Sequence, residues 1–275
     1  MSFPAIPLPE RLRPTLRLLR RVAVPLWALS QRELKARYAG TRLGTFWALL
    51  QPLATLGIYL AVFVLVLHGD RSGTQAREYA LFILAGLLPF QTLADGLHRA
   101  CGSLRQDKPL LEAANFPAAV IPLARVLSSA VPGLLGLLLL ALACIVWGPA
   151  GGPGAALLAL PLIWLGALVL GAGLALWTSL IAVFATDMAE FLGFALTALL
   201  FLTPIFYAAD QLPPVLAGLL WANPLHHVVE AYRGVLLQAH LPWGHGLALL
   251  LWAGLSLGSG LWAFRRVLDA MRDEL

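Results

Sequence analysis

Six long apolar stretches decide what this chain can fold into. They lie at about 46–68, 79–101, 119–147, 155–184, 191–207 and 245–264. A helix needs about 20 apolar residues to cross a bilayer, so the stretch at 191–207 is short for a full span. Only 12% of the residues are charged, too few to form the polar shell of a soluble protein. The sequence therefore predicts an all-α integral membrane protein with six transmembrane helices in residues 46–264, and it excludes a soluble enzyme.

The basic residues indicate the orientation of these spans. Sixteen of the 19 Lys and Arg residues fall in 1–45, in 99–125 or in the tail 265–275. Three fall on the other side: Arg71, Arg77 and Arg233. Because Lys and Arg near span ends resist translocation, we expect both termini to be cytoplasmic. The same distribution accounts for the net charge of +5 without a nucleic-acid partner.

The basic region 1–45 has the pattern of a helix lying in the headgroup layer. Apolar residues recur at spacings of three and four between Leu18 and Leu29, and arginines fill much of the remainder. We expect Pro25 to break this interfacial amphipathic helix into two pieces. The alternative is a frayed basic tail that only follows the distribution of charge across the membrane.

The segment between the fifth and sixth stretches is too apolar for a simple solvated loop, and its prolines prevent one long helix. Two short re-entrant helices, at about 212–221 and 225–238 within a gate region of about 208–240, fit both features. Such backbone is tolerated in a membrane only where protein or a water-filled cavity covers it, which indicates a pore or gate. The gate candidates are Pro204, Tyr207, Trp221, Glu230, Tyr232 and Arg233, and Glu230 is spaced to pair with Arg233.

The chain lacks the motifs of nucleotide and metal chemistry. It contains no GxxxxGK[ST] phosphate loop, no HExxH pair and no GxSxG elbow. His226, His227 and Glu230 supply too few ligands for a zinc site. We therefore expect no catalytic residue and no bound cofactor or metal, so that ATP and Mg would belong to a partner ATPase.

Polar residues inside the apolar stretches are few, which makes each a functional candidate. Near the end of the second stretch lie Gln91, Asp95, His98 and Arg99. Asp95 and Arg99 are spaced to neutralise each other as an i,i+4 pair. The alternative is that these side chains form the hydrophilic wall of a substrate cavity.

Five segments, together with Asp187-Met188 after the fourth apolar stretch, resemble the permease subunits of type-2 ABC exporters for polysaccharides, the O-antigen, teichoic acid and capsule group. They are RELKARYAGTRLGTFWALLQP at 32–52, YALFILAGLLPF at 79–90, NFPAAVIPL at 115–123, TPIFYAADQLPP at 203–214 and NPLHHVVEAYRGVLL at 223–237. Each is loose alone, but their common order along the chain is specific. The resemblance implies a homodimer in the bacterial cytoplasmic (inner) membrane, with two ATP-binding cassette subunits beneath it. The complex would export a lipid-linked glycan, and this chain would not itself be an enzyme.

The region 104–116 resembles the coupling helix that docks onto the ATPase. Its candidate contacts are Arg105, Asp107, Lys108, Leu110, Leu111, Glu112, Asn115 and Phe116. Where relatives often carry two lysines before Asn-Phe-Pro, this chain has Glu112 and Ala113, so the charge of its docking surface differs from theirs.

Residues ahead of the first span form a candidate entrance for an anionic lipid head, because arginine binds phosphate through two parallel hydrogen bonds. They are Arg32, Lys35, Arg37, Tyr38 and Arg42. Simple anchoring of the topology is the alternative role. The candidates for the channel wall are Trp47, Tyr59, Phe63, Phe82, Phe90, Gln91, Asp95 and Phe201, since aromatic rings pack on the flat faces of sugars.

Two other functions stay open. One is a type-2 ABC permease for a small drug or lipid. The other is a membrane-embedded glycan-modifying enzyme, for which only Asp95 and His98 approach the required acid and base. Copurification with a stoichiometric ATPase would favour a transporter over the enzyme.

The missing phosphate loop generates a first prediction. The purified chain should hydrolyse no ATP, and hydrolysis should appear only when the ATPase partner is added. A phosphate-release assay on the chain with and without the partner measures this. Hydrolysis that stays with the isolated chain after contaminating ATPases are removed would contradict it.

Overall fold

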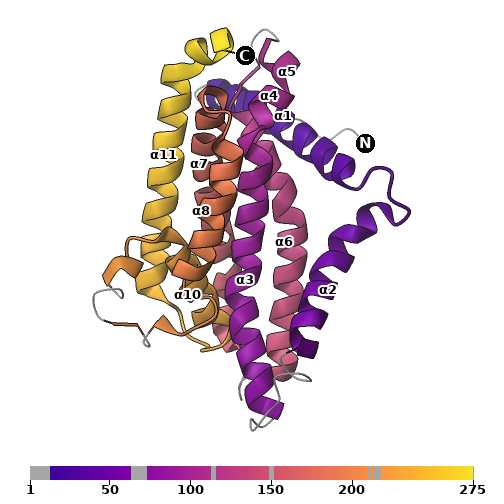
Figure 1. Ribbon diagram of the computed structural model, residues 1–275, viewed down its shortest axis with the longest axis vertical. Coiled ribbons are helices and arrows are strands. Elements are labelled where there is room, and N and C mark those ends of the chain that lie inside the picture. Colours follow the sequence, from indigo (N-terminus) through magenta and orange to yellow (C-terminus); the bar gives the residue numbers. More distant parts are fainter. Residues whose placement is uncertain are drawn as a thin grey trace, which may run out of the picture.

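The computed structural model describes residues 13–62, 73–112, 116–148, 152–209, 212–213 and 218–274, and the regular secondary structure in these ranges is helical. The long helices α3 (Gly73–Cys101), α6 (Val120–Trp147), α7 (Leu160–Phe184) and α11 (Trp243–Glu274) run along one axis (Figure 1). α2 (Trp47–Ala61) packs at one side against α6, and α8 (Met188–Leu202) lies beside α3 and α7. We call the end at which α1 (Arg13–Arg37) crosses the bundle the inner end.

Five helical segments are long and apolar enough to cross a bilayer. They are Gly44–Ala61, Gln75–Cys101, Val120–Trp147, Gly154–Phe184 and Trp243–Val267. The first and fourth include short 3₁₀ turns, Gly44–Phe46 and Gly154–Ala159. The sixth apolar helix, α8, has only 15 residues, in agreement with the short fifth stretch of the sequence. The chain is a multi-pass, all-helical membrane protein.

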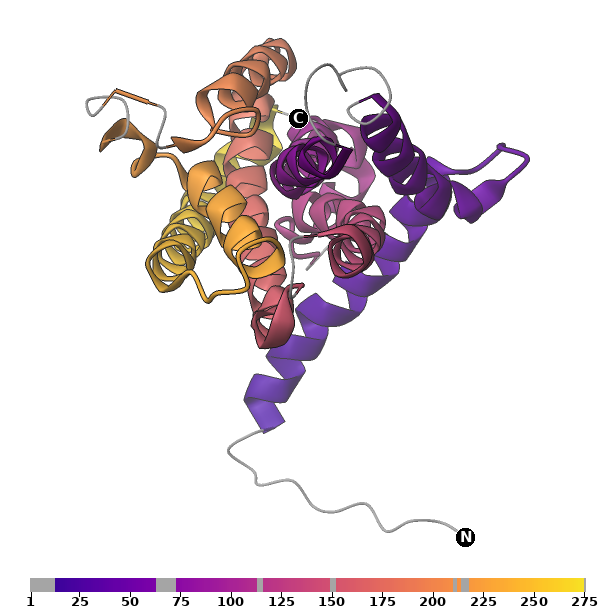
Figure 2. The ribbon, with the colours of Figure 1, turned by 90° about the horizontal axis from the view of Figure 1, so that it is seen from below.

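α1 is one continuous helix, so the expected break at Pro25 is wrong. A proline inside a helix removes one backbone hydrogen bond, and tertiary contacts further along α1 offset that loss. Leu29 is buried in an apolar cluster with Leu104 and Phe264. Trp27 faces the other way and is exposed, and Figure 2 shows α1 running diagonally across the bundle and past its edge. Its placement in the headgroup layer stays a prediction.

The spans differ sharply in how much of their surface the rest of the chain covers. Of the most apolar 18 residues of the α3 span, 67% are buried, because α3 packs against α6, α7 and α10 (Pro224–Leu236). In the Gly44–Ala61 segment only 17% is buried, because α2 packs mainly on α6. One side of α2 is therefore left uncovered by this chain.

The gate region forms one of the two expected short helices clearly. α10 covers 224–236, close to the expected 225–238, and it is buried against α3 and α11. Of the other expected helix, at 212–221, the structure shows helix at 218–220, while 214–217 lie outside the described residues. Asn223 caps α10 by accepting a hydrogen bond from the Leu225 amide, at 3.0 Å. Its Nδ2 also donates to Thr203 Oγ1 at 2.9 Å, which ties α10 to the end of α8.

α7 and α11 approach each other closely because small residues line their contact. A Cβ added at Gly173 would collide with the backbone of Ser256 and Leu257, and one at Gly260 would lie 3.1 Å from the Gly173 carbonyl oxygen. Trp177 Nε1 donates to Ser259 Oγ at 3.1 Å in the same contact. This is the close packing of small residues that stabilises helix pairs in membranes.

The contact generates a second prediction. Gly173→Leu should lower the free energy of unfolding by about 1–3 kcal/mol or more, because the helices must separate to admit the side chain. Gly258→Leu on α11 is the matched control, because a Cβ at Gly258 meets nothing within 4 Å. Thermal unfolding in detergent compares them, and equal midpoints for the two variants would contradict the prediction.

Candidate functional site

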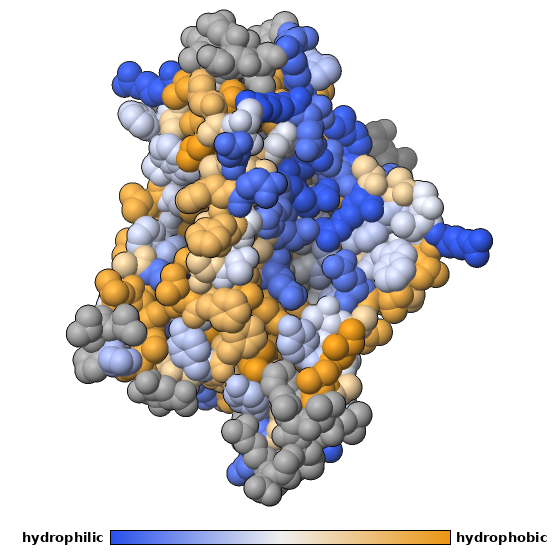
Figure 3. All heavy atoms as spheres, in the orientation of Figure 1, coloured by the Kyte–Doolittle hydropathy of each residue, from blue (hydrophilic) through white to orange (hydrophobic). Residues whose placement is uncertain are grey.

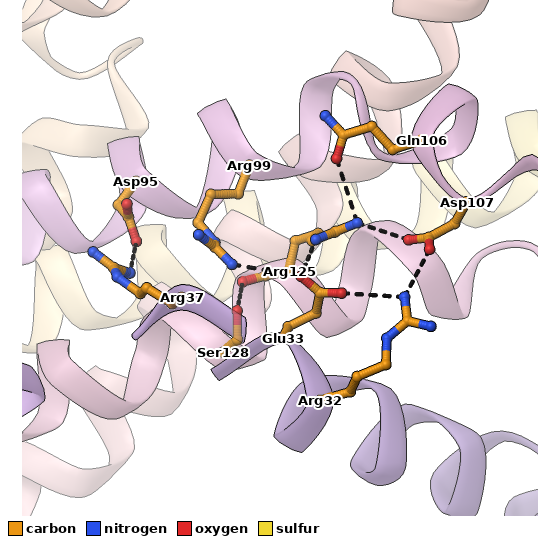
Figure 4. A network of polar contacts seen from close by, with 9 residues as sticks. All are labelled: Arg32, Glu33, Arg37, Asp95, Arg99, Gln106, Asp107, Arg125 and Ser128. Atoms are coloured by element: carbon orange, nitrogen blue, oxygen red, sulfur yellow. Dashed lines mark hydrogen bonds and ion pairs between the residues drawn. The ribbon is translucent and has the colours of Figure 1, made fainter. Parts of the chain in front are cut away.

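A network of charged side chains joins four elements at the inner end (Figure 4). It connects α1 with α3, with the junction between α4 (Ser103–Gln106) and α5 (Lys108–Glu112), and with α6. Its charged members are Arg32, Glu33, Arg37, Asp95, Arg99, Asp107 and Arg125. Four arginines against three carboxylates give the network a formal charge of +1.

Glu33 is the centre of the network. Its side chain is only 6% exposed and forms ion pairs with Arg125, with Arg99 at 3.6 Å and with Arg32 at 3.3 Å. A buried charge is tolerated only when it is paired and hydrogen-bonded. One carboxylate therefore holds three arginines from three helices, and the last turns of α1 are fixed against α3 and α6.

Asp107 extends the network to the α4–α5 junction. Its two carboxylate oxygens accept hydrogen bonds from Arg32 and Arg125, both at 2.7 Å, and the side chain is almost buried. The sequence placed Asp107 in the ATPase docking surface, but the structure turns it toward α1 and α6. The outward side of α4 and α5 carries Arg105 and the pair of Lys108 and Glu112.

The other docking candidates lie mostly inward. Leu111 is buried, and Leu110 and Phe116 are partly buried against the same apolar cluster as Leu29. The exposed Arg105 also donates to the Val183 carbonyl at the end of α7, at 2.7 Å. Asn115 lies outside the described residues.

Asp95 has a different partner from the one expected. Arg37 Nη1 lies 2.6 Å from Asp95 Oδ2, and Arg99 pairs with Glu33. The expected mutual neutralisation of Asp95 and Arg99 is therefore wrong. Local spacing on one helix favoured that pair, but the C-terminal end of α1 brings a second arginine and a second carboxylate to α3.

A polar groove of about 300 Å³ runs between α2, α3 and α6, beginning at the Arg37–Asp95 pair. Its polar lining consists of Arg37, Gln51, Thr55, Gln91, Thr92, Asp95 and Ser129. Figure 3 shows hydrophilic side chains gathered below α1 between α3 and α2, with hydrophobic surface on both sides. Polar groups at this depth need water or protein as a neighbour, because lipid tails offer no hydrogen bonds.

Only some of the residues that the sequence suggested for the channel wall line the groove. Gln91 and Asp95 line the groove. Phe90 is buried in the core, while Trp47 and Phe201 are exposed on the outside of this chain. Tyr59 and Phe82 pack against the core, and Phe63 lies outside the described residues. The groove is thus lined by neutral polar side chains more than by aromatic rings.

The entrance candidates likewise fall into two groups, residues of the network and residues outside it. Arg32 and Arg37 belong to the network, whereas Lys35 and Arg42 are exposed to solvent. Tyr38 is buried, and its hydroxyl group has no hydrogen-bond partner.

Sequence reasoning missed Glu33 and Arg125, although each carries a signal. Glu33 is the single carboxylate between Glu10 and Asp70, in the most basic part of the chain. Arg125 is a lone charge in the third apolar stretch, and such residues are generally functional or paired. It also missed the groove residues Gln51, Thr55, Thr92 and Ser129.

At the outer end, Arg233 is buried and holds the loop after α8. It donates to the carbonyl oxygens of Pro204 at 2.6 Å and Ile205 at 2.8 Å, and its guanidinium lies 3.5 Å from the ring centre of Phe82. The expected pair with Glu230 is confirmed at 3.0 Å.

The remaining gate candidates lie around this centre. Tyr232 is buried and Trp221 is exposed, and Tyr207 donates to the Phe201 carbonyl at 2.9 Å. His227 and His245 approach to 3.1 Å between their Nδ1 atoms. No His, Cys, Asp or Glu group in the described ranges is arranged to hold a metal ion.

A third prediction concerns Glu33. Glu33→Gln should lower the free energy of unfolding by about 3–5 kcal/mol, because three arginines lose their shared buried partner. Glu112→Gln, which removes an exposed carboxylate from the pair with Lys108, should cost about 1 kcal/mol or less. Denaturation of both variants in the same detergent measures the difference, and similar losses would show that Glu33 is not the centre of the network.

Comparison with known proteins assigns the sequence to a family. Residues 25–237 match the family described as ABC-2 type transporter. The chain is 25% identical over 233 residues to the O-antigen export system permease protein RfbA of Klebsiella pneumoniae, covering 84% of this chain and 87% of that protein.

Two further relatives are similar over most of their length. The protein of the same name from Myxococcus xanthus is 27% identical over 253 residues, which is 90% of this chain and 93% of that protein. The polysialic acid transport protein KpsM of Escherichia coli is 28% identical over 251 residues, 90% and 95% of the two chains. The chain belongs to the ABC-2 type transporter family, as a membrane-spanning subunit that works with a partner ATPase.

Proposed function

We propose that this chain is the permease of an ABC transporter that exports a lipid-linked polysaccharide across the bacterial cytoplasmic membrane. The observation that carries the proposal is the polar groove that starts at the arginine-rich inner end and continues along the spans. The names of the relatives, which refer to O-antigen export and polysialic acid transport, support the same substrate class.

The chemistry of the groove favours a sugar polymer over a small drug or lipid. Gln51, Gln91 and Ser129 offer amide and hydroxyl groups that both donate and accept hydrogen bonds. The hydroxyls of Thr55 and Thr92 donate to carbonyl groups of their own helices and can accept from a ligand. A sliding hydrated polymer exchanges such weak contacts one by one. A pocket for a drug-sized molecule is lined mainly by apolar side chains, whereas seven of the twelve residues that line this groove have polar side chains.

The alternative of a glycan-modifying enzyme has little support in the geometry. Asp95 is held by Arg37 from α1, whereas the ring of His98 lies beside Gly193 of α8. The two side chains thus have neighbours on different helices. A general acid and base must converge on one reacting bond.

The functional unit of this proposal is a homodimer. The groove opens beside α2, whose outer side this chain leaves uncovered. A second copy would shield the polar side chains from lipid and enclose a water-filled path between two grooves. Two ATP-binding cassette subunits, which carry ATP and Mg, would dock on the outward sides of α4 and α5. The inner end and both termini would then face the cytoplasm.

A fourth prediction tests this function. Thr55→Leu combined with Gln91→Leu should reduce polysaccharide on the cell surface about thirtyfold, because two hydrogen-bonding side chains are lost, each contributing about 1 kcal/mol. Surface and cytoplasmic glycan are measured in a strain that carries this chain as its only permease for that polymer. We expect glycan to accumulate inside.

Gln238→Leu, in the exposed segment after α10, is the control for replacing an amide by leucine. Protein levels and copurifying ATPase must match between the variants. Normal surface glycan in the double variant would show that the groove is not part of the export path.

A further inference from the structure

The Arg37–Asp95 ion pair stands at the inner mouth of the groove. Both residues line the groove, and no other ion pair among the described residues has both members in that lining. The side chains are 17% and 35% exposed, so the pair is reached from the groove and is not sealed in the core. A ligand that enters the groove from this end meets the pair first.

The surroundings of the pair hold hydrogen-bond donors that lack acceptors. The Tyr38 hydroxyl is buried and has no partner, and the same is true of Arg99 Nε and Ser129 Oγ. Asp95, Arg37 and Tyr38 all lie close enough to act electrostatically on Arg99. Buried donors are normally satisfied, so these atoms indicate a place where an oxygen-rich group binds.

The charge at this place favours an anion. Asp95 pairs with Arg37 and Glu33 pairs with the neighbouring Arg99, while the whole network carries a formal charge of +1. A phosphate group has more acceptor oxygens than a carboxylate and matches the N–H fork of a guanidinium equally well. An anion with more than one negative charge therefore competes well for Arg37.

We propose that the Arg37–Asp95 pair is an exchangeable lock, in which a multiply charged phosphate group on the transported lipid replaces Asp95 on Arg37. This inference rests on the proposed function and assigns the recognition step of that same groove. Asp95 sets how strongly a ligand must bind Arg37 to replace it. A neutral glycolipid leaves the ion pair intact, and a singly charged phosphodiester lipid competes weakly. The displaced carboxylate stays near the inner mouth, and the phosphate gains Tyr38 and Arg99 as donors.

The fold allows this exchange without loss of the network. Arg37 is the last residue of α1, and a turn follows in which Gly40 has a φ of +80°, a conformation suited to glycine. Glu33 and Asp107 hold the preceding turn of α1 through Arg125 and Arg32. Opening the lock therefore needs only the end of α1 to move.

Binding of defined probes to the chain in complex with its ATPase tests the lock. The probes are a polyprenyl diphosphate, phosphatidylglycerol and inorganic phosphate, titrated in detergent and followed by native mass spectrometry. Asp95→Asn should bind the polyprenyl diphosphate about tenfold more tightly, because no carboxylate competes for Arg37. Glu190→Gln, at an exposed site in the first turn of α8, changes the charge equally and should leave the affinity unchanged.

Arg37→Lys keeps the charge but loses the planar guanidinium, so it should weaken polyprenyl diphosphate binding severalfold. Because Arg37→Lys keeps the positive charge, it also tests the site where a variant that removes the charge fails to fold. Unchanged or weaker binding by Asp95→Asn would overturn the lock and make the pair a structural one. An equal gain for phosphatidylglycerol would overturn the selectivity, and a gain for inorganic phosphate alone would overturn a lipid as the ligand.

The same variants separate this inference from the proposed function. If cells export polysaccharide normally and Asp95→Asn gains no affinity, the lock fails and the export function stands. If Asp95→Asn binds the diphosphate lipid more tightly and no polysaccharide is exported by the complex, the export function fails and the phosphate site stands.

Discussion

Burial of the Glu33 carboxylate is the interaction on which the inner half of this protein depends. A charge away from water must be compensated in place, and here the compensation comes from three different helices. Without it, α1 would rest on the bundle mainly through the apolar contacts around Leu29. The amphipathic helix would then be an adsorbed segment and not a part of the folded core.

The carboxylates of the network have two different roles. Glu33 and Asp107 are nearly enclosed and bind arginines from several elements, which suits a rigid joint. Asp95 is more open, holds one arginine at 2.6 Å and faces the groove. A joint that stays intact while a neighbouring pair opens lets substrate act on the end of α1 without loosening the α4–α5 junction.

The sequence predicts the spans well because membrane thickness imposes a length that apolar composition reveals directly. It fails where partners are distant along the chain. Arg37 pairs with a residue 58 positions away and Arg125 with one 92 positions away, so a helix-spacing rule chose Arg99 for Asp95 instead. The break at Pro25 failed for a related reason, since local propensity could not account for the contacts that hold α1. Aromatic rings were natural channel candidates by type, but only the packing of α2, α3 and α6 reveals which side chains share a groove.

The brevity of α8 has a consequence for the membrane itself. Fifteen residues extend about 22 Å, which is less than a hydrocarbon core of about 30 Å. Such a mismatch is relieved by thinning of the bilayer beside the helix or by further protein that completes the crossing. Here residues 203–205 follow α8 directly, so the carbonyl groups of Pro204 and Ile205 lie where α8 stops. The guanidinium of Arg233 supplies the hydrogen bonds that lipid cannot. This arginine thus satisfies the carbonyl groups that further turns of α8 would have satisfied.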